Sequence, residues 1–116
     1  MELINVLDTL KEQINFKKTT SPGDIILVCM PGGISYGLVH SIENDAKKNW
    51  YNLTFTLLTV PPLKVTWTLR IPQMCGEIFT INDQEHCVIA VDINSMKEEE
   101  KVEKPQKRSL TLIKNE

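Results

Sequence analysis

The chain has 116 residues, of which 41% are hydrophobic and 24% charged, and its formal net charge is −2. This profile fits one ordinary globular domain that needs no disulfide or metal to fold. The slightly acidic balance argues against binding to duplex DNA, which usually requires a clear basic excess. The apolar runs are too short to cross a bilayer, and the first residues lack the basic start of a secretory signal. We therefore expect a cytoplasmic, bacterial-type protein without membrane contact.

Residues 2–16 predict an amphipathic helix. Leu3, Leu7, Leu10 and Ile14 recur at spacings of four, three and four residues, which places them in one apolar stripe. A helix of this length is marginal in water by itself, so the stripe has to dock on another surface. We expect it to cover the sheet that follows, and a contact with a second subunit is the alternative.

The next two segments predict strands. "DIILVCM", Asp24 to Met30, is apolar on both faces, which indicates a strand that is covered on both sides. "SYGLVHSI", Ser35 to Ile42, follows a glycine-containing turn. Gly37 inside it indicates a bulge or a tight barrel corner.

Residues 51–69 predict a hairpin around two consecutive prolines. Apolar residues alternate with threonines and other polar residues on both sides of the prolines, which is the period of a half-buried strand. A three-residue loop, Pro61 to Leu63, brings the two apolar sets to one face and pairs Leu57 with Trp67. The outer face then carries these polar side chains: Asn52, Thr54, Thr56, Lys64, Thr66, Thr68 and Arg70.

A second hairpin is expected between Cys75 and Ile93. Its loop is assigned to residues 82–85, and Phe79 is paired with Ile89 so that the apolar side chains share a face.

Together these segments predict one α+β, mainly β domain over residues 1–94. The helix spans 2–16, and about six antiparallel strands form a small, strongly bent β-barrel over 24–93. A two-layer sheet with the helix on one face remains the alternative. Residues 95–116 mix charges of both signs and predict a partly disordered tail. Within the tail, "SLTLI", 109–113, alternates again and could form a last strand at the sheet edge.

The segment "SPGDIILV", followed by a glycine turn and "YGLVHSI", resembles the opening of small barrels of the Src-homology-3 type. Among these, the PemK-like toxin ribonucleases open with a similar "GDI" strand and glycine-containing loop. The resemblance implies a small barrel, and for that family an arginine-proline pair at the start of the second strand. This chain has "ISYG" at residues 34–37 in that place. No catalytic residue and no activity is therefore carried over.

The cysteines and histidines do not form a metal-binding or nucleophilic pattern. Zinc sites usually begin with two ligands separated by two to four residues, whereas eleven residues separate Cys75 from Cys87. His86 is adjacent to Cys87 on a strand, so the two point to opposite faces, and His86 is assigned to the surface. A Cys29–His40 pair is disfavoured because apolar surroundings raise the pKa of a thiol. We expect free, buried thiols, no metal and no cofactor.

Four residues remain as a candidate ligand-binding set: Tyr36, His40, Trp50 and Arg70. Tyr36 and His40 are assigned to one face of the second strand, and Trp50 and Arg70 flank the threonine-rich face. That face would suit a peptide strand or RNA. We expect a non-enzymatic binding or assembly module for a protein partner or a second copy of itself. The alternative is an RNA-binding or RNA-cleaving barrel, which convergence of the four in one positive groove would favour over scatter with a buried His40.

Overall fold

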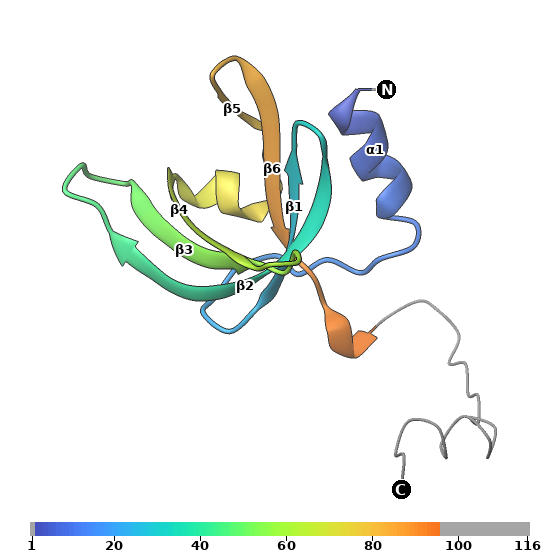
Figure 1. Ribbon diagram of the computed structural model, residues 1–116, viewed down its shortest axis with the longest axis horizontal. Coiled ribbons are helices and arrows are strands. Elements are labelled where there is room, and N and C mark those ends of the chain that lie inside the picture. Colours follow the sequence, from blue (N-terminus) through green and yellow to red (C-terminus); the bar gives the residue numbers. More distant parts are fainter. Residues whose placement is uncertain (1, 96–116) are drawn as a thin grey trace, which may run out of the picture.

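The computed structural model describes residues 2–95 and shows one helix beside a strongly curled sheet (Figure 1). Six strands hydrogen-bond antiparallel in the order β4-β3-β2-β1-β6-β5, which leaves β4 and β5 as the two edges of a half-barrel. The coarse prediction of a helix and six antiparallel strands is confirmed. Residues 96–116, including the strand predicted over 109–113, lie outside the described part of the chain. The elements are α1 (Leu3–Leu10), β1 (Ile25–Met30), β2 (Gly33–Asn44), β3 (Tyr51–Leu57), β4 (Leu63–Leu69), the 3-10 turn η1 (Ile71–Cys75), β5 (Phe79–Ile81), β6 (Gln84–Ala90) and the 3-10 turn η2 (Ile93–Ser95).

Strands β1 and β6 lie between two apolar clusters, because their successive side chains point to opposite faces. On the concave side, Ile26 and Val28 of β1 are fully buried with side chains of β3 and η1. On the convex side, Leu27 and Cys29 pack with β6 beneath α1, whose Leu7 is buried. The prediction that the first strand is covered on both sides is confirmed, and the helix forms the second cover (Figure 1).

The helix is shorter than the predicted 2–16, because it ends at Leu10. Hydrogen-bonded turns continue to Ile14, whose amide donates to the Leu10 carbonyl at 2.8 Å. The chain then pairs with the end of β6: the Lys17 amide donates to the Ala90 carbonyl at 2.8 Å, and the Asp92 amide donates to the Asn15 carbonyl at 2.8 Å. Such pairing requires an extended backbone, so the helix cannot continue through these residues. Ile14 still packs against the cluster under α1, which explains why its spacing fitted the helical stripe.

The β3–β4 hairpin has the predicted faces but a different register. Trp67 pairs with Leu53, not Leu57, and the loop spans the five residues between β3 and β4, with a cis peptide bond between Val60 and Pro61. The shift from the predicted pairing is four residues. An even shift leaves each side chain on its own face, so Phe55 still points into the core and the threonines still point outward.

In the β5–β6 hairpin, the observed residue pairing is shifted from the predicted pairing by an odd number of residues. Phe79 pairs with His86 rather than Ile89, and the turn consists of Asn82 and Asp83 alone. Both turn residues have positive φ, 53° and 65°, as a tight two-residue hairpin turn requires. Because the shift is odd, His86 moves from the predicted surface to the concave core.

A bulge in β2 separates side chains that the sequence placed together. The pairing with β3 shifts between Val39 and Ser41, so His40 is the extra residue. Tyr36 therefore faces outward, whereas Ile42, predicted on its face, packs against the concave core. Gly37, where the sequence predicted a bulge or a tight corner, pairs regularly with Leu57, and the bulge lies three residues later. The strands approach closely at Gly37, because an added Cβ would lie 3.2 Å from the Phe55 ring.

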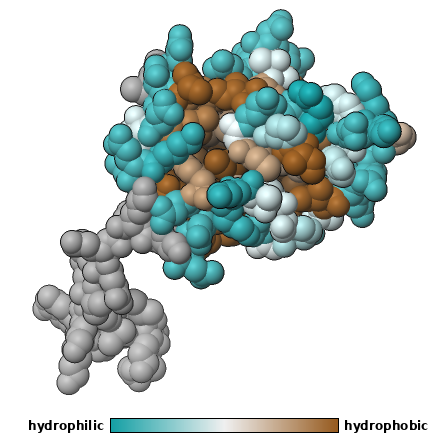
Figure 2. Space-filling view, turned by 180° about the vertical axis from the view of Figure 1, so that it is seen from behind, coloured by the Kyte–Doolittle hydropathy of each residue, from teal (hydrophilic) through white to brown (hydrophobic). Residues whose placement is uncertain are grey.

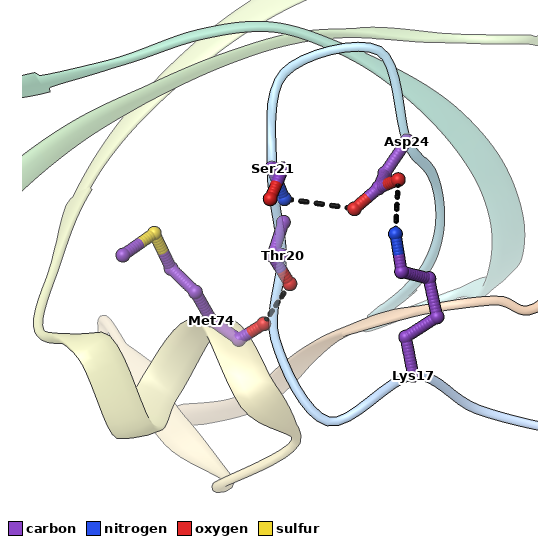
Figure 3. Close-up of polar contacts among 5 residues, drawn as sticks. All are labelled: Lys17, Thr20, Ser21, Asp24 and Met74. Carbon is purple, nitrogen blue, oxygen red and sulfur yellow. Dashed lines mark hydrogen bonds and ion pairs between the residues drawn. The ribbon is translucent and has the colours of Figure 1, made fainter.

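Polar contacts hold the connection between α1 and β1 against the sheet (Figure 3). The Lys17 ammonium lies 2.6 Å from one Asp24 oxygen, and the other Asp24 oxygen accepts the Ser21 amide at 2.8 Å. The Thr20 hydroxyl donates to the Met74 carbonyl of η1 at 2.5 Å. These contacts tie the incoming chain to η1, the turn that lies over the concave side of the sheet.

Candidate functional site

The main candidate surface lies between the two edges of the half-barrel. A recess of about 370 Å³ is lined by Trp67 and Leu69 of β4 and by Phe79 and Ile81 of β5, with Trp50 at one end. We call this recess and the edge of β4 beside it the seam. Within residues 2–95, no strand pairs with β4 or β5 on the seam side, so both present backbone hydrogen-bonding groups there.

Burial changes abruptly from β3 to β4. Leu53 and Phe55 of β3 have no exposed surface, whereas their direct partners on β4, Trp67 and Val65, are only half-buried. At the end of the strand, Leu63 is 57% exposed. These β4 side chains point toward the concave side. The apolar face of β4 is therefore less completely covered than the apolar face of β3.

Aromatic rings form the floor of the seam. The Trp67 ring meets Phe55, Phe79 and His86 edge to face at centroid distances of 5.2, 5.7 and 5.4 Å. His86 stacks on Phe79 and its Nδ1 lies 2.8 Å from the Gln84 carbonyl. The predicted surface position of His86 is therefore wrong, because the two-residue turn brings this side chain inside. Of these rings, Trp67 and Phe79 line the recess itself.

Trp50 and Arg70, two of the four predicted ligand residues, lie together at the end of the seam. The Arg70 guanidinium lies 5.7 Å from the centre of the Trp50 ring, and the Lys47 ammonium lies 5.1 Å from it. Arg70 also lies 3.9 Å from a Glu77 carboxylate oxygen. Cations over an indole ring are attracted by its negative face, so this group forms a local positive site on an otherwise slightly acidic chain.

Tyr36 and His40 lie elsewhere. His40 is exposed and its Nε2 lies 2.6 Å from the Thr56 hydroxyl on the outer face. Tyr36 is 43% exposed and borders a separate apolar recess of about 300 Å³ together with Leu58 and Ile93. The structure thus brings Trp50 and Arg70 together but does not join them to Tyr36 or His40. The four residues are therefore scattered, but His40 is exposed rather than buried, so neither of the two expected arrangements is met in full.

The outer face of β3 and β4 is polar, as predicted. The Thr54 and Thr66 hydroxyls lie 3.0 Å apart, and the Thr68 hydroxyl donates to the Asn52 side-chain oxygen at 2.7 Å. These side chains largely satisfy one another across the strands. The face therefore offers fewer free donors to a ligand than its composition indicates.

The cysteines are free thiols, and two of them form a buried pair. Cys29 lies directly opposite Cys87 under α1. Their hydrogen bond lowers the pKa of Cys29, because the Cys87 S–H stabilises a thiolate there. The same hydrogen bond and burial raise the pKa of Cys87. This corrects the expectation that apolar surroundings alone would set the pKa of Cys29.

Cys75, His86 and Cys87, which were not expected to bind a metal, do not converge on one site. His86 points to the aromatic floor, whereas Cys87 points to the opposite face, beneath α1, and its thiol lies 3.4 Å from the Gly76 carbonyl. Within residues 2–95, no cluster of three or more histidine, cysteine or acidic side chains is arranged to hold a metal.

Apolar side chains are also exposed outside the seam, among them Ile4, Ile34 and Leu58. Seen from behind, brown patches occupy the middle of the face within a hydrophilic rim (Figure 2). None of the helices between residues 2 and 95 is long and apolar enough to span a bilayer.

The seam was not predicted from the sequence, in which the outer threonine face was the candidate surface. The inner residues Val65, Phe79 and Ile81 were read only as core. The number of strands could have indicated the seam, because a sheet of six strands has two edge strands unless it closes into a barrel. Comparison of the chain with family models, with curated proteins and with solved structures gives no match in any of the three.

Proposed function

We propose that the protein is a non-enzymatic cytoplasmic module that binds an extended peptide segment in the seam, where the segment adds a strand beside β4. The observation that carries the proposal is the half-buried apolar face of β4 next to an edge that no strand in the described part of the chain pairs with. Strand addition supplies main-chain hydrogen bonds for affinity, and pockets for alternate side chains supply specificity. A bound strand would cover Val65 and Trp67 and pair the free backbone groups at the same time.

The geometry predicts the chemistry of the peptide. Its inward residues, two positions apart, would lie over Val65 and Trp67 and fill the recess in front of Phe79, so they should be apolar. Its outward residues would lie beside Thr66 and Thr68, so they should be small and polar. The expected ligand is a stretch of alternating apolar and hydroxyl or amide side chains.

We also propose that the half-barrel is of the Src-homology-3 type. This proposal is supported by the strong curl of a sheet built from short antiparallel strands and by the close approach of strands at Gly37. Domains of that type bind extended chains in grooves lined by aromatic side chains. The Trp67 and Phe79 rings give this seam a comparable lining.

The proposal is tested with a library of nine-residue peptides of alternating apolar and polar residues, screened against the full chain by tryptophan fluorescence and titration. Val65→Asp should abolish binding of the selected peptides, because it places a charge on the covered face. Lys64→Asp is the matched control, since the same residue is introduced one position away on the outer face. Equal binding by both variants, or selection of no peptide, would refute the proposal.

RNA binding is a second candidate, favoured by one observation. Lys47 and Arg70 flank Trp50 at the end of the seam, and a positive site beside an aromatic ring suits a single strand. Fluorescence anisotropy with mixed short RNAs at two salt concentrations tests it. Binding that weakens with salt and is lost in Arg70→Glu would support this candidate, and no binding at low salt would remove it.

A further inference from the structure

We infer that the chain carries its own occupant for the seam: residues 109–113, "SLTLI", bind beside β4 and compete with the partner peptide. This inference rests on the proposed function, because it requires that the seam accept an added strand. It assigns a role to a segment whose alternating sequence otherwise has no explanation in the sheet.

The segment has the side-chain pattern that the seam requires. Leu110 and Leu112 are two positions apart, as are Val65 and Trp67 on β4, so one face of the segment would supply both inward apolar residues. Thr111 would then point outward beside Thr66, whose hydroxyl already lies 3.0 Å from that of Thr54. The added strand would extend this hydroxyl row across a third strand, which is a favourable cross-strand arrangement.

The connection is long enough for the segment to reach the seam. The described part of the chain ends at Ser95, and thirteen residues, 96–108, separate it from Ser109. Thirteen extended residues span up to about 43 Å, whereas a domain of this size is roughly 30 Å across. No position on the surface of the domain is therefore out of reach.

Attachment to the same chain favours self-occupation over a second copy. A tethered segment is present at an effective concentration in the millimolar range, which exceeds ordinary protein concentrations. Even a weak strand contact would then be largely formed within one molecule. A partner peptide has to displace it, so its apparent affinity is reduced by the fraction of seams that are open.

The test compares three full-length chains. The variant Leu110→Asp/Leu112→Asp removes the inward residues of the segment, and Met96→Asp/Val102→Asp is the matched control, with the same two apolar-to-acid changes in the connection. Amide hydrogen exchange of β4 is measured in each. We expect β4 edge amides to exchange at least about tenfold faster in the first variant than in the wild type, and at the wild-type rate in the control.

A second measurement adds the synthetic peptide of residues 107–115 in trans. It should bind the Leu110→Asp/Leu112→Asp chain at least about tenfold more tightly than it binds the wild type, and restore protection of β4, because the wild-type seam is already occupied. Sedimentation at two concentrations should show a monomer for all three chains. A wild-type dimer that dissociates in the Leu110→Asp/Leu112→Asp variant would overturn occupation within one chain in favour of a second copy.

The outcomes separate the two proposals. If β4 exchanges equally in all three chains and the 107–115 peptide does not bind, self-occupation is wrong. If library peptides of alternating pattern still bind the variant in that case, the peptide-binding function stands without it. If no peptide binds any of the chains, both proposals are wrong.

Discussion

Replacement of Trp67 by alanine tests the arrangement on which the seam depends. The ring lies at the meeting point of three other rings, with centroids 5.2 to 5.7 Å away. A core tryptophan buries roughly 150–250 Å², and half-burial leaves about 75–125 Å² to be lost. At about 25 cal/mol per Å² this corresponds to about 2–3 kcal/mol. Loss of the edge-to-face contacts adds to this area term, so the expected cost is about 3–4 kcal/mol.

The assay is urea unfolding followed by far-ultraviolet circular dichroism, since Trp50 would confuse a fluorescence signal. The control is Thr56→Ala on the outer face. This change removes one exposed hydrogen bond to His40 and should cost less than about 1 kcal/mol. Domains of this kind are stable by only about 5–15 kcal/mol, so the Trp67 variant should unfold at a clearly lower urea concentration. Similar costs for the two substitutions would refute the assignment of Trp67 to the inner face and would remove the seam.

Three further sets of substitutions test other contacts. Gly76→Ala should destabilise by about 2 kcal/mol, since its φ is 108° and a new Cβ would lie 3.1 Å from a β6 side chain, whereas Gly33→Ala meets no atom within 4 Å and should be near neutral in the same urea assay. A Gly76→Ala chain as stable as the wild type would contradict the turn conformation. Cys75, the least buried cysteine, should react first with a thiol reagent, and Cys75→Ser should abolish that fast phase; an unchanged fast phase would show that the buried pair opens readily. Asp24→Ala should destabilise the fold by about 1–2 kcal/mol and Lys17→Ala by less than about 1 kcal/mol, because Asp24 also accepts a hydrogen bond from a backbone amide. Additive costs in the double variant would show that the two side chains do not interact.

On β3 and β4, alternation in the sequence determined which side of each strand is buried, but not which residues pair. On β3 and β4 the predicted register differs by four residues, and the faces survive because side chains repeat every two residues. Phe55 and Trp67 were therefore placed correctly, although the five-residue loop was not foreseen. The length of a loop depends on local backbone geometry that alternation does not encode.

Two local features reversed predicted orientations. The two-residue turn at Asn82 and Asp83 made the β5–β6 shift odd and carried His86 inside, although these residue types tolerate positive φ and could have indicated the turn. The bulge at His40 left no mark in the pattern of β2, since it depends on pairing with β3. The extended chain after Ile14, predicted as helix, likewise follows from backbone pairing with the end of β6, a contact between segments far apart in sequence.

The candidate site was predicted only in part. Trp50 and Arg70 were chosen as aromatic and basic residues near strand ends, and they do lie together. The seam depends on how far a sheet curls and on which strands become its edges. Those properties arise from the register of all six strands together, so no single stretch of sequence reports them.

The helix beneath β1 and β6 also affects how the chain is made. Residues 3–10 leave the ribosome early, but the surface that buries Leu7 includes β6, which follows roughly eighty residues later. At a translation rate of about 5–20 residues per second, the apolar stripe of the nascent helix stays uncovered for about 4–16 seconds before β6 is synthesised. During translation this stripe is a natural target for a chaperone.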